Sequence, residues 1–226
     1  LHGREPGDDA QHTLREVQAL GAAGHVFAAD LADEAACAAL LPAVVAHFGR
    51  ADAVVNNASA FEYDDVASFG YAAMERHWRA NTAPAIVLAR ALHAHRVADG
   101  GANGCVVNLL DQKLWNPNPD YLSYTLSKAA LEAATTLLAQ ALAPQVRVCG
   151  VAPGVTLVSG PMTEQQLARA QTMTPLRRSS TPADVAHAVR FVLQAGAITG
   201  TTLLVDGGQH LLGQPRDVLF LAQQAG

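Results

Sequence analysis

The stretch G-C-V-V-N-L-L-D, residues 104–111, decides the fold class of this chain. Its first seven residues carry no charge, which is typical of a strand buried on both faces of a parallel sheet. The first charged residue, Asp111, follows where that strand should end. An Ala/Leu-rich helix is predicted next, over residues 121–142. A buried strand followed by a helix is the repeating unit of an α/β fold.

The same alternation of strand and helix recurs along the chain. Further strands are predicted at residues 25–30, 51–58, 146–154 and 201–208, and further helices at residues 34–48, 71–96 and 182–194. Parallel strands joined by right-handed crossovers form a doubly wound, Rossmann-like sheet, which binds ligands at the carboxyl ends of its strands. We expect one such domain over residues 1–226, with a lid over residues 156–178.

One expected feature of a dinucleotide fold is missing from the sequence. Such a fold usually opens with a strand, a Gly-rich turn and a helix. Here there is no G-x-x-x-G-x-G, and L-H-G-R at residues 1–4 looks like the end of a second strand. We expect that the first βα unit is absent from this chain; the alternative is that phosphates are bound in another way.

Composition and charge narrow the class of protein. Of the 226 residues, 50% are hydrophobic and 15% are charged, which favours a large buried core over disorder. The net charge of -5 gives no bulk attraction to nucleic acid or to an anionic membrane. With no apolar run of 18 residues, we expect a cytoplasmic protein whose ligands are small molecules.

The cysteines and histidines do not suggest a metal site. Cys37, Cys105 and Cys149 are far apart, and the nine histidines show no H-E-x-x-H or similar spacing. We therefore expect three reduced thiols and no bound metal.

Tyr124 and Lys128 carry the clearest chemical signal. At i and i+4 they share one face of the predicted helix. A phenol titrates near pH ~10, and a neighbouring ammonium favours the phenolate and lowers that pKa. The pair could then pass a proton to a substrate while a cofactor supplies hydride. Taken alone, the same spacing also fits a solvated helix face.

The surrounding motifs make the pattern specific. N-N-A-S at 56–59, Asn81, V-V-N at 106–108, P-G at 153–154 and V-D-G-G at 205–208 stand in order around Y-x-x-x-K. Over essentially the whole chain, this set resembles the short-chain dehydrogenase/reductase family.

The resemblance implies roles for individual residues. Tyr124 would be the catalytic acid/base, and Lys128 would lower its pKa and hold the nicotinamide ribose. Asn81 would help to hold a water in a proton relay. The resemblance also implies that the cofactor is bound with the help of two turns, which contain Asn57, Ala58, Pro153 and Gly154.

Asp111 stands where that family usually has a serine, whose hydroxyl polarises a carbonyl. A carboxylate cannot donate a hydrogen bond unless it is protonated. It suits a ring N–H or an amidine-like edge, so Asp111 favours a C=N substrate over a C=O substrate. The alternative role is a cap on a helix or turn.

One branch of the family shares this departure. N-N-A-S-A-F at 56–61, with Asp111, Tyr121, Tyr124 and Lys128, resembles pteridine reductases and bacterial dihydropteridine or dihydromonapterin reductases. This resemblance implies that Phe61 sandwiches a pterin against the nicotinamide, that Ser59 contacts ligand and cofactor, and that Tyr121 lines the pocket. Phe61 could instead be a core residue and Ser59 a turn residue, and Trp115 could either line the pocket or pack beside it.

The first residues of the sequence indicate which dinucleotide the protein would prefer. L-H-G-R resembles the L-H-x-x-R of that branch with one spacing residue fewer, so His2 and Arg4 would lie at the cofactor. Arg4 would bind an adenosine 2′-phosphate, which implies NADPH, unless it is simply a solvated arginine. Asp30 and Leu31 match the pair that contacts adenine.

The sequence therefore predicts an NADPH-dependent reductase of a pterin-like C=N substrate. The alternatives are a carbonyl reductase or alcohol dehydrogenase of the same family, and a non-catalytic cofactor-binding protein. The resemblance also implies a homotetramer, and the apolar segment V-L-F-L, residues 218–221, is expected to pack on a partner subunit rather than to be exposed.

Overall fold

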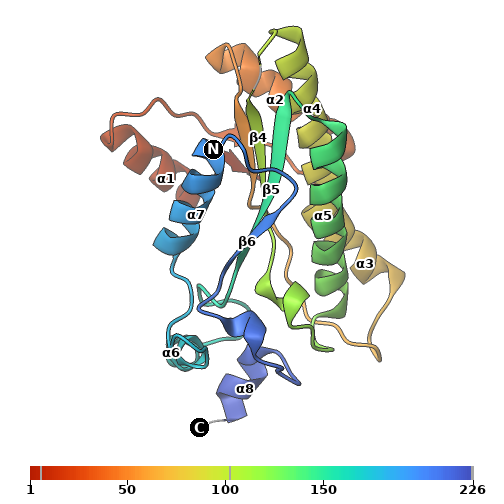
Figure 1. Ribbon diagram of the computed structural model, residues 1–226, viewed down its shortest axis with the longest axis vertical. Helices are drawn as coiled ribbons and strands as arrows, with labels where there is room; N and C mark the ends of the chain where they lie inside the picture. The colour runs from red at the N-terminus through yellow and green to blue at the C-terminus, as the bar shows by residue number, and fades with distance from the viewer. Residues whose placement is uncertain (6, 102, 225–226) are drawn as a thin grey trace.

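A four-stranded parallel sheet forms the centre of the computed structural model, which describes residues 1–5, 7–101 and 103–224 (Figure 1). Its strands lie in the order β3 (Ala53–Asn56), β4 (Gly104–Leu109), β5 (Val146–Pro153) and β6 (Thr202–Val205). All neighbours run parallel. The predicted α/β class with a Rossmann-like parallel sheet is confirmed.

A second, two-stranded sheet lies apart from the first. Its strands β1 (His2–Gly3) and β2 (Phe27–Ala28) are also parallel. Within the described part of the chain, no strand is hydrogen bonded to both sheets. Among the described strands, β3 is therefore the edge of the four-stranded sheet, with a partner strand on one side alone.

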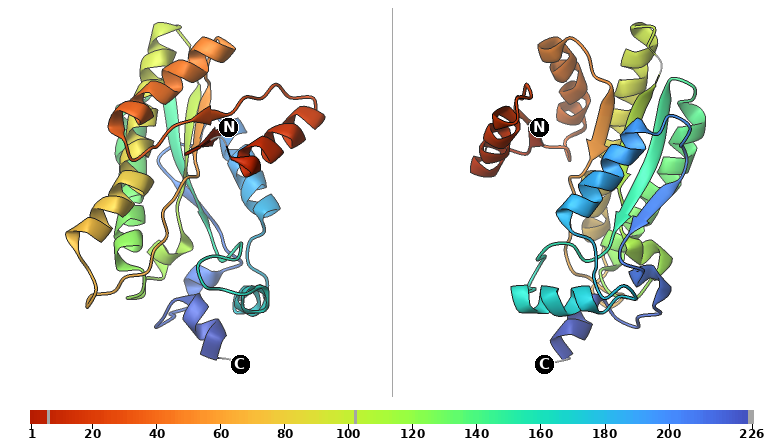
Figure 2. Two further views of the ribbon diagram at one scale, coloured as in Figure 1. Left: turned by 180° about the vertical axis from the view of Figure 1, so that it is seen from behind. Right: turned by 60° about the vertical axis from the view of Figure 1, so that its left-hand side comes forward.

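Helices cover the four-stranded sheet on both faces, as the run of apolar residues in β4 predicts. All six residues of β4 are buried. Val106 packs with residues of α2 (Glu34–Phe48) and α4 (Ala83–Ala98), whereas Val107 packs against α7 (Pro182–Gln194) on the other face. Figures 1 and 2 show α2, α4 and α5 (Leu122–Ala141) on one side of the sheet and α7 on the other.

Two helix boundaries follow directly from their end residues. The predicted ranges 34–48 and 182–194 match α2 and α7. Asp33 caps the start of α2, and Gly49 ends it with a φ of 82°, a left-handed conformation that glycine adopts without steric cost. Thr181 and Asp184 form a capping box at the start of α7.

The predicted helix over residues 71–96 is interrupted. The structure has α3 (Tyr71–His77), a π-helical turn (Trp78–Thr82) and then α4. Asn81 lies in that turn, buried and hydrogen bonded to other segments. Such turns often occur at functional sites.

Sequence reasoning missed three helices. These are α1 (Asp8–Ala19), α6 (Glu164–Thr172) and α8 (Val218–Gln224). The helix α6 lies within the predicted lid and begins with a capping box formed by Thr163 and Gln166. Both α6 and α8 lie beyond the carboxyl ends of the strands, below the sheet in Figure 1.

The apolar segment at residues 218–221 was expected to pack on a partner subunit, and this part of the prediction needs correction. Val218 and Leu219 are buried within their own chain, in a cluster with Met162 and Ala170. Packing of α8 on α6 therefore accounts for these side chains without a partner.

Across the described residues, no helix has the length and apolar character needed to cross a membrane.

Candidate active site

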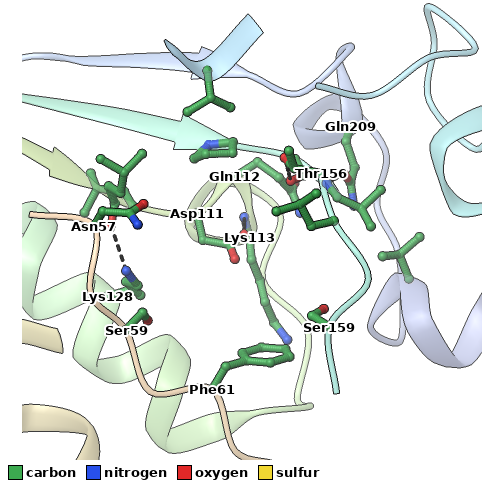
Figure 3. Close-up of a pocket in the computed structure, with 18 of the residues that line it drawn as sticks. Asn57, Ser59, Phe61, Asp111, Gln112, Lys113, Lys128, Thr156, Ser159 and Gln209 are labelled. Carbon is green, nitrogen blue, oxygen red and sulfur yellow. Dashed lines mark hydrogen bonds between the residues drawn. The ribbon is translucent and has the colours of Figure 1, made fainter. Parts of the chain in front are cut away.

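A cavity of about 770 Å³ lies at the carboxyl ends of β4 and β5 (Figure 3). This is the edge of the sheet at which the sequence predicted a ligand. Nine predicted site residues line the cavity: Asn57, Ser59, Phe61, Asp111, Tyr121, Tyr124, Lys128, Pro153 and Gly154.

Asp111 uses its two carboxylate oxygens for two different purposes. Tyr124 Oη donates a hydrogen bond of 2.8 Å to Oδ2. The backbone N–H of Lys113 donates one of 2.8 Å to Oδ1, so Asp111 also caps the short 3₁₀ helix Gln112–Trp115. The capping role predicted as the alternative is therefore present, and it fixes the carboxylate beside the phenol. The role of Asp111 toward a substrate stays a prediction.

The pKa of Tyr124 is shifted in the opposite direction from the one expected from Lys128 alone. Burial, followed by the charge and hydrogen bond of Asp111, raises the pKa of Tyr124 well above its ordinary value. Burial also raises the pKa of Asp111. In the protein by itself, Tyr124 is thus protonated and can act as a proton donor, but it is a weaker acid than a free phenol.

Lys128 lies close to Tyr124 in the cavity. Its Nζ donates a 2.7 Å hydrogen bond to the carbonyl of Leu109 and lies 5.8 Å from the centroid of the Tyr124 ring. Burial lowers the pKa of Lys128 to about 8. The ammonium faces the cavity with hydrogen-bonding capacity left, since it carries three N–H donors.

Asn81 fastens the loop after β3 to the helix that carries Tyr124. Its Oδ1 accepts a 2.6 Å hydrogen bond from the N–H of Ala60, and its Nδ2 donates to the Ala60 carbonyl and to Ser127 Oγ. The side-chain amide is thus committed to holding the loop, and the water relay implied by the family resemblance stays a prediction.

Asp64 caps α5 from a distant part of the sequence. Tyr121, the residue before α5, is left-handed with a φ of 55° and offers no side-chain cap. Instead, the Asp64 carboxylate accepts hydrogen bonds from the N–H and the Oγ of Ser123, and its carbonyl accepts one from the N–H of Leu122. Sequence reasoning missed this residue, because it lies 59 positions from its partner.

We expect Asp64→Ala to lower both stability and turnover. Loss of a helix cap and of the partner for buried Ser123 should lower the free energy of unfolding by about 1–3 kcal/mol. Because α5 carries Tyr124 and Lys128, kcat should fall as well. Urea unfolding and steady-state kinetics measure the two effects. Asp33→Ala, which removes the cap of α2, is the control; an equal loss of kcat in both variants would contradict the positioning role.

Aromatic side chains surround the phenol. Phe61 stacks on Tyr121 with ring centroids 4.2 Å apart, and its ring meets that of Tyr124 edge-on at 4.7 Å. Trp115 is 39% exposed and is not among the residues that line the cavity. The structure therefore does not support its prediction as a pocket residue.

Three of the residues predicted to bind the cofactor, His2, Leu31 and Ala58, line a second cavity of about 500 Å³. Asn81 lines it as well, and it shares Val55 and Asn57 with the first cavity. The predicted sites thus follow one path along the ends of the strands.

Arg4 and Asp30 lie outside both cavities. The Arg4 side chain is 76% exposed, and its Nε lies 4.0 Å from Asp30 Oδ1. This leaves the guanidinium accessible to an anion, but also partly matched by the carboxylate of Asp30. In the part of the chain that the structure describes, no group of three or more His, Cys, Asp or Glu residues is arranged to hold a metal ion.

Fold and site together define a class of protein. A parallel α/β sheet with a buried Tyr/Lys pair at its carboxyl edge is suited to proton and hydride transfer. Residues 5–210 match the family model described as enoyl-(acyl carrier protein) reductase. The chain belongs to the short-chain dehydrogenase/reductase family of oxidoreductases.

Relatives differ in the substrates that their names give. A protein named as a ketoacyl reductase of granaticin polyketide synthase, from Streptomyces violaceoruber, is 36% identical over 81% of this chain and 76% of its own length. Pteridine reductase 1 of Leishmania tarentolae is 33% identical over 77% of this chain and 68% of its own length.

Solved structures include one with a bound dinucleotide. FolM alternative dihydrofolate reductase 1 from Brucella canis, complexed with NADP, is 34% identical with a TM-score of 0.88. The match covers 96% of this chain and 85% of that one.

Proposed function

We propose that this protein is an NADPH-dependent reductase of a dihydropterin-like C=N bond. The observation that carries the proposal is the 2.8 Å hydrogen bond from Tyr124 Oη to Asp111 Oδ2. A carboxylate beside the proton donor can accept from a ring N–H, which a ketone does not offer. The pteridine reductase and FolM relatives support the same substrate class.

The donor set of the site fits a dinucleotide. Lys128 can give further hydrogen bonds to ribose hydroxyls, and the second cavity begins at Asn57, next to the first. Arg4, with its exposed guanidinium, would hold a 2′-phosphate. When bound, NADPH supplies a hydride from its nicotinamide ring. The NADP in the related Brucella structure supports this choice of cofactor.

The residues of this chain would orient the substrate and deliver a proton. The flat ring would pack on Phe61, which Tyr121 holds by stacking. Tyr124, which is protonated in the protein by itself, would give its proton to the ring nitrogen. Asp111 would accept from a substrate N–H or share a proton with Tyr124, and its raised pKa favours that sharing. Lys128 would stabilise the phenolate left behind.

A substrate panel tests the proposal. NADPH oxidation would be measured with 7,8-dihydrobiopterin, dihydromonapterin and dihydrofolate, beside ketones that include an acyl thioester. Turnover of a dihydropterin is the expected result. Turnover of ketones alone would overturn it in favour of the second candidate, a carbonyl reductase, which the ketoacyl reductase relative favours.

The proposal includes self-association and a cytoplasmic location. Leu126 and Leu137 on α5, and Val97 on α4, are large, exposed apolar side chains on the side of the sheet that carries α2, α4 and α5. A homotetramer would cover such side chains. Light scattering measures the mass of the assembly, and a monomer would contradict the homotetramer.

The buried free thiols of Cys37, Cys105 and Cys149 support a reducing compartment.

A further inference from the structure

The cavity continues past the Asp111–Tyr124 pair to a polar end next to the start of α8. Lys113, Asn118, Gln214 and Asp217 line this end. Figure 3 shows Lys113 extending from beside Asp111 toward Phe61. The part of a substrate that lies beyond its reacting bond would reach these side chains.

Lys113 is a buried cation that is already matched by an anion. The residue is 3% exposed. Its Nζ donates to the carbonyl of Asp120 at 2.6 Å and to Asp217 Oδ2 at 3.1 Å. Asp217 also caps α8, because its Oδ1 accepts a hydrogen bond from the N–H of Leu219. The pair thus joins the turn after Asp111 to the C-terminal helix with no net charge.

The other cations of the cavity lie elsewhere. Among the described residues that line it, these are Lys128, at the Tyr124 end, and Arg190, on α7. In Figure 1, α7 lies over the sheet and away from α8. An anionic group at the polar end would therefore meet the carboxylate of Asp217 without an unmatched cation to compensate for its lost hydration.

We propose that Lys113 and Asp217 form a charge filter, which selects substrates with a neutral, hydrogen-bonding group at this end over substrates with an anionic one. The amides of Asn118 and Gln214 can bond a hydroxyl or an amide. The inference rests on the proposed function in taking this cavity as the substrate site. It names the residues that set the charge of the accepted substrate.

Asp217→Asn tests the filter. Asparagine is as good a helix cap as aspartate, so α8 should keep its start. Lys113 would then be an unmatched cation. We expect the ratio of kcat/KM for an anionic substrate to that for a neutral one to rise by at least about tenfold. Dihydrofolate and dihydrobiopterin form one matched pair, and a keto acid and its methyl ester form a second.

Two further variants separate charge from structure. Lys113→Met leaves Asp217 unmatched, so the same ratio should fall. Arg216→Gln breaks the neighbouring 2.8 Å ion pair with Asp120, which fastens the same segment, and Arg216 does not line the cavity. The ratio should not rise in that variant, because the Asp120 carboxylate that loses its partner adds negative charge beside Lys113. An unchanged ratio in Asp217→Asn, or an equal rise in Arg216→Gln, would overturn the filter.

The two substrate pairs keep this test separate from that of the proposed function. Turnover of the keto pair alone would contradict a C=N substrate, and the filter would still be measured on that pair. Turnover of dihydropterins with no response to Asp217→Asn would contradict the filter and leave the proposed function standing.

Discussion

Replacing Tyr124 by phenylalanine is expected to lower kcat by about 10²–10⁴-fold, the range over which a positioned general acid contributes to rate. The change removes Oη, which lines the cavity and donates to Asp111 at 2.8 Å. The ring keeps its edge-on contact with Phe61, so the pocket should keep its shape. Stopped-flow or steady-state NADPH oxidation with a saturating substrate measures the effect.

The matched control is Tyr63→Phe. Tyr63 is half-exposed, its hydroxyl contacts Asp65 at 3.4 Å, and it does not line the cavity. Its kcat should stay close to that of the wild type. NADPH affinity, followed by fluorescence, should be the same in both variants. A Tyr124→Phe protein that keeps a third or more of its turnover would remove the phenol from the mechanism.

Replacing Asp111 by alanine is expected to lower turnover of a dihydropterin by about 10²-fold, at the lower end of what an acid–base group contributes. Oδ2 orients the Tyr124 hydroxyl, and the carboxyl group is the one expected to face a substrate N–H. Loss of Oδ1 also removes the cap of the 3₁₀ helix, which should cost about 1 kcal/mol of stability.

Asp111→Asn and Asp111→Ser separate chemistry from capping. Both keep an oxygen for the N–H of Lys113, so both should be more stable than Asp111→Ala. Both can also donate a hydrogen bond to a carbonyl. We therefore expect each variant to lose dihydropterin turnover. The ratio of ketone turnover to dihydropterin turnover should be higher in each variant than in the wild type. Dihydropterin turnover that is unchanged in all three variants would sink the assigned role of Asp111.

Several elements could be predicted from patterns in their own residues. The apolar run before Asp111 predicted β4, and the end residues of α2 and α7 predicted their boundaries. The i, i+4 spacing of Tyr124 and Lys128 was enough to place both side chains in one cavity.

Contacts between distant segments were beyond such patterns. Asp64 finds Ser123 across 59 positions, and Lys113 finds Asp217 across 104. Each looks like an ordinary polar residue in its own stretch of sequence. The prediction that the pKa of Tyr124 is lowered was wrong for a related reason. Burial and the Asp111 carboxylate come from the fold, and both raise this pKa despite the ammonium of Lys128 one helical turn away.

The separation of the two sheets has a consequence for the order in which parts of the molecule open. The unit β1–α1–β2 has no backbone hydrogen bond to the four-stranded sheet among the described strands, and none of the twelve residues of α1 is buried. Its ring contacts to the four-stranded domain run from His25 and Phe27 to His47 and Phe48 of α2. A region held mainly by side-chain contacts of this kind should unfold locally at a lower free energy than the rest. A dinucleotide that spans His2, Asn57 and Lys128 would bridge this region to the sheet, and its binding free energy would add to the stability of that unit. In this protein the cofactor would then be a structural element as well as a reagent.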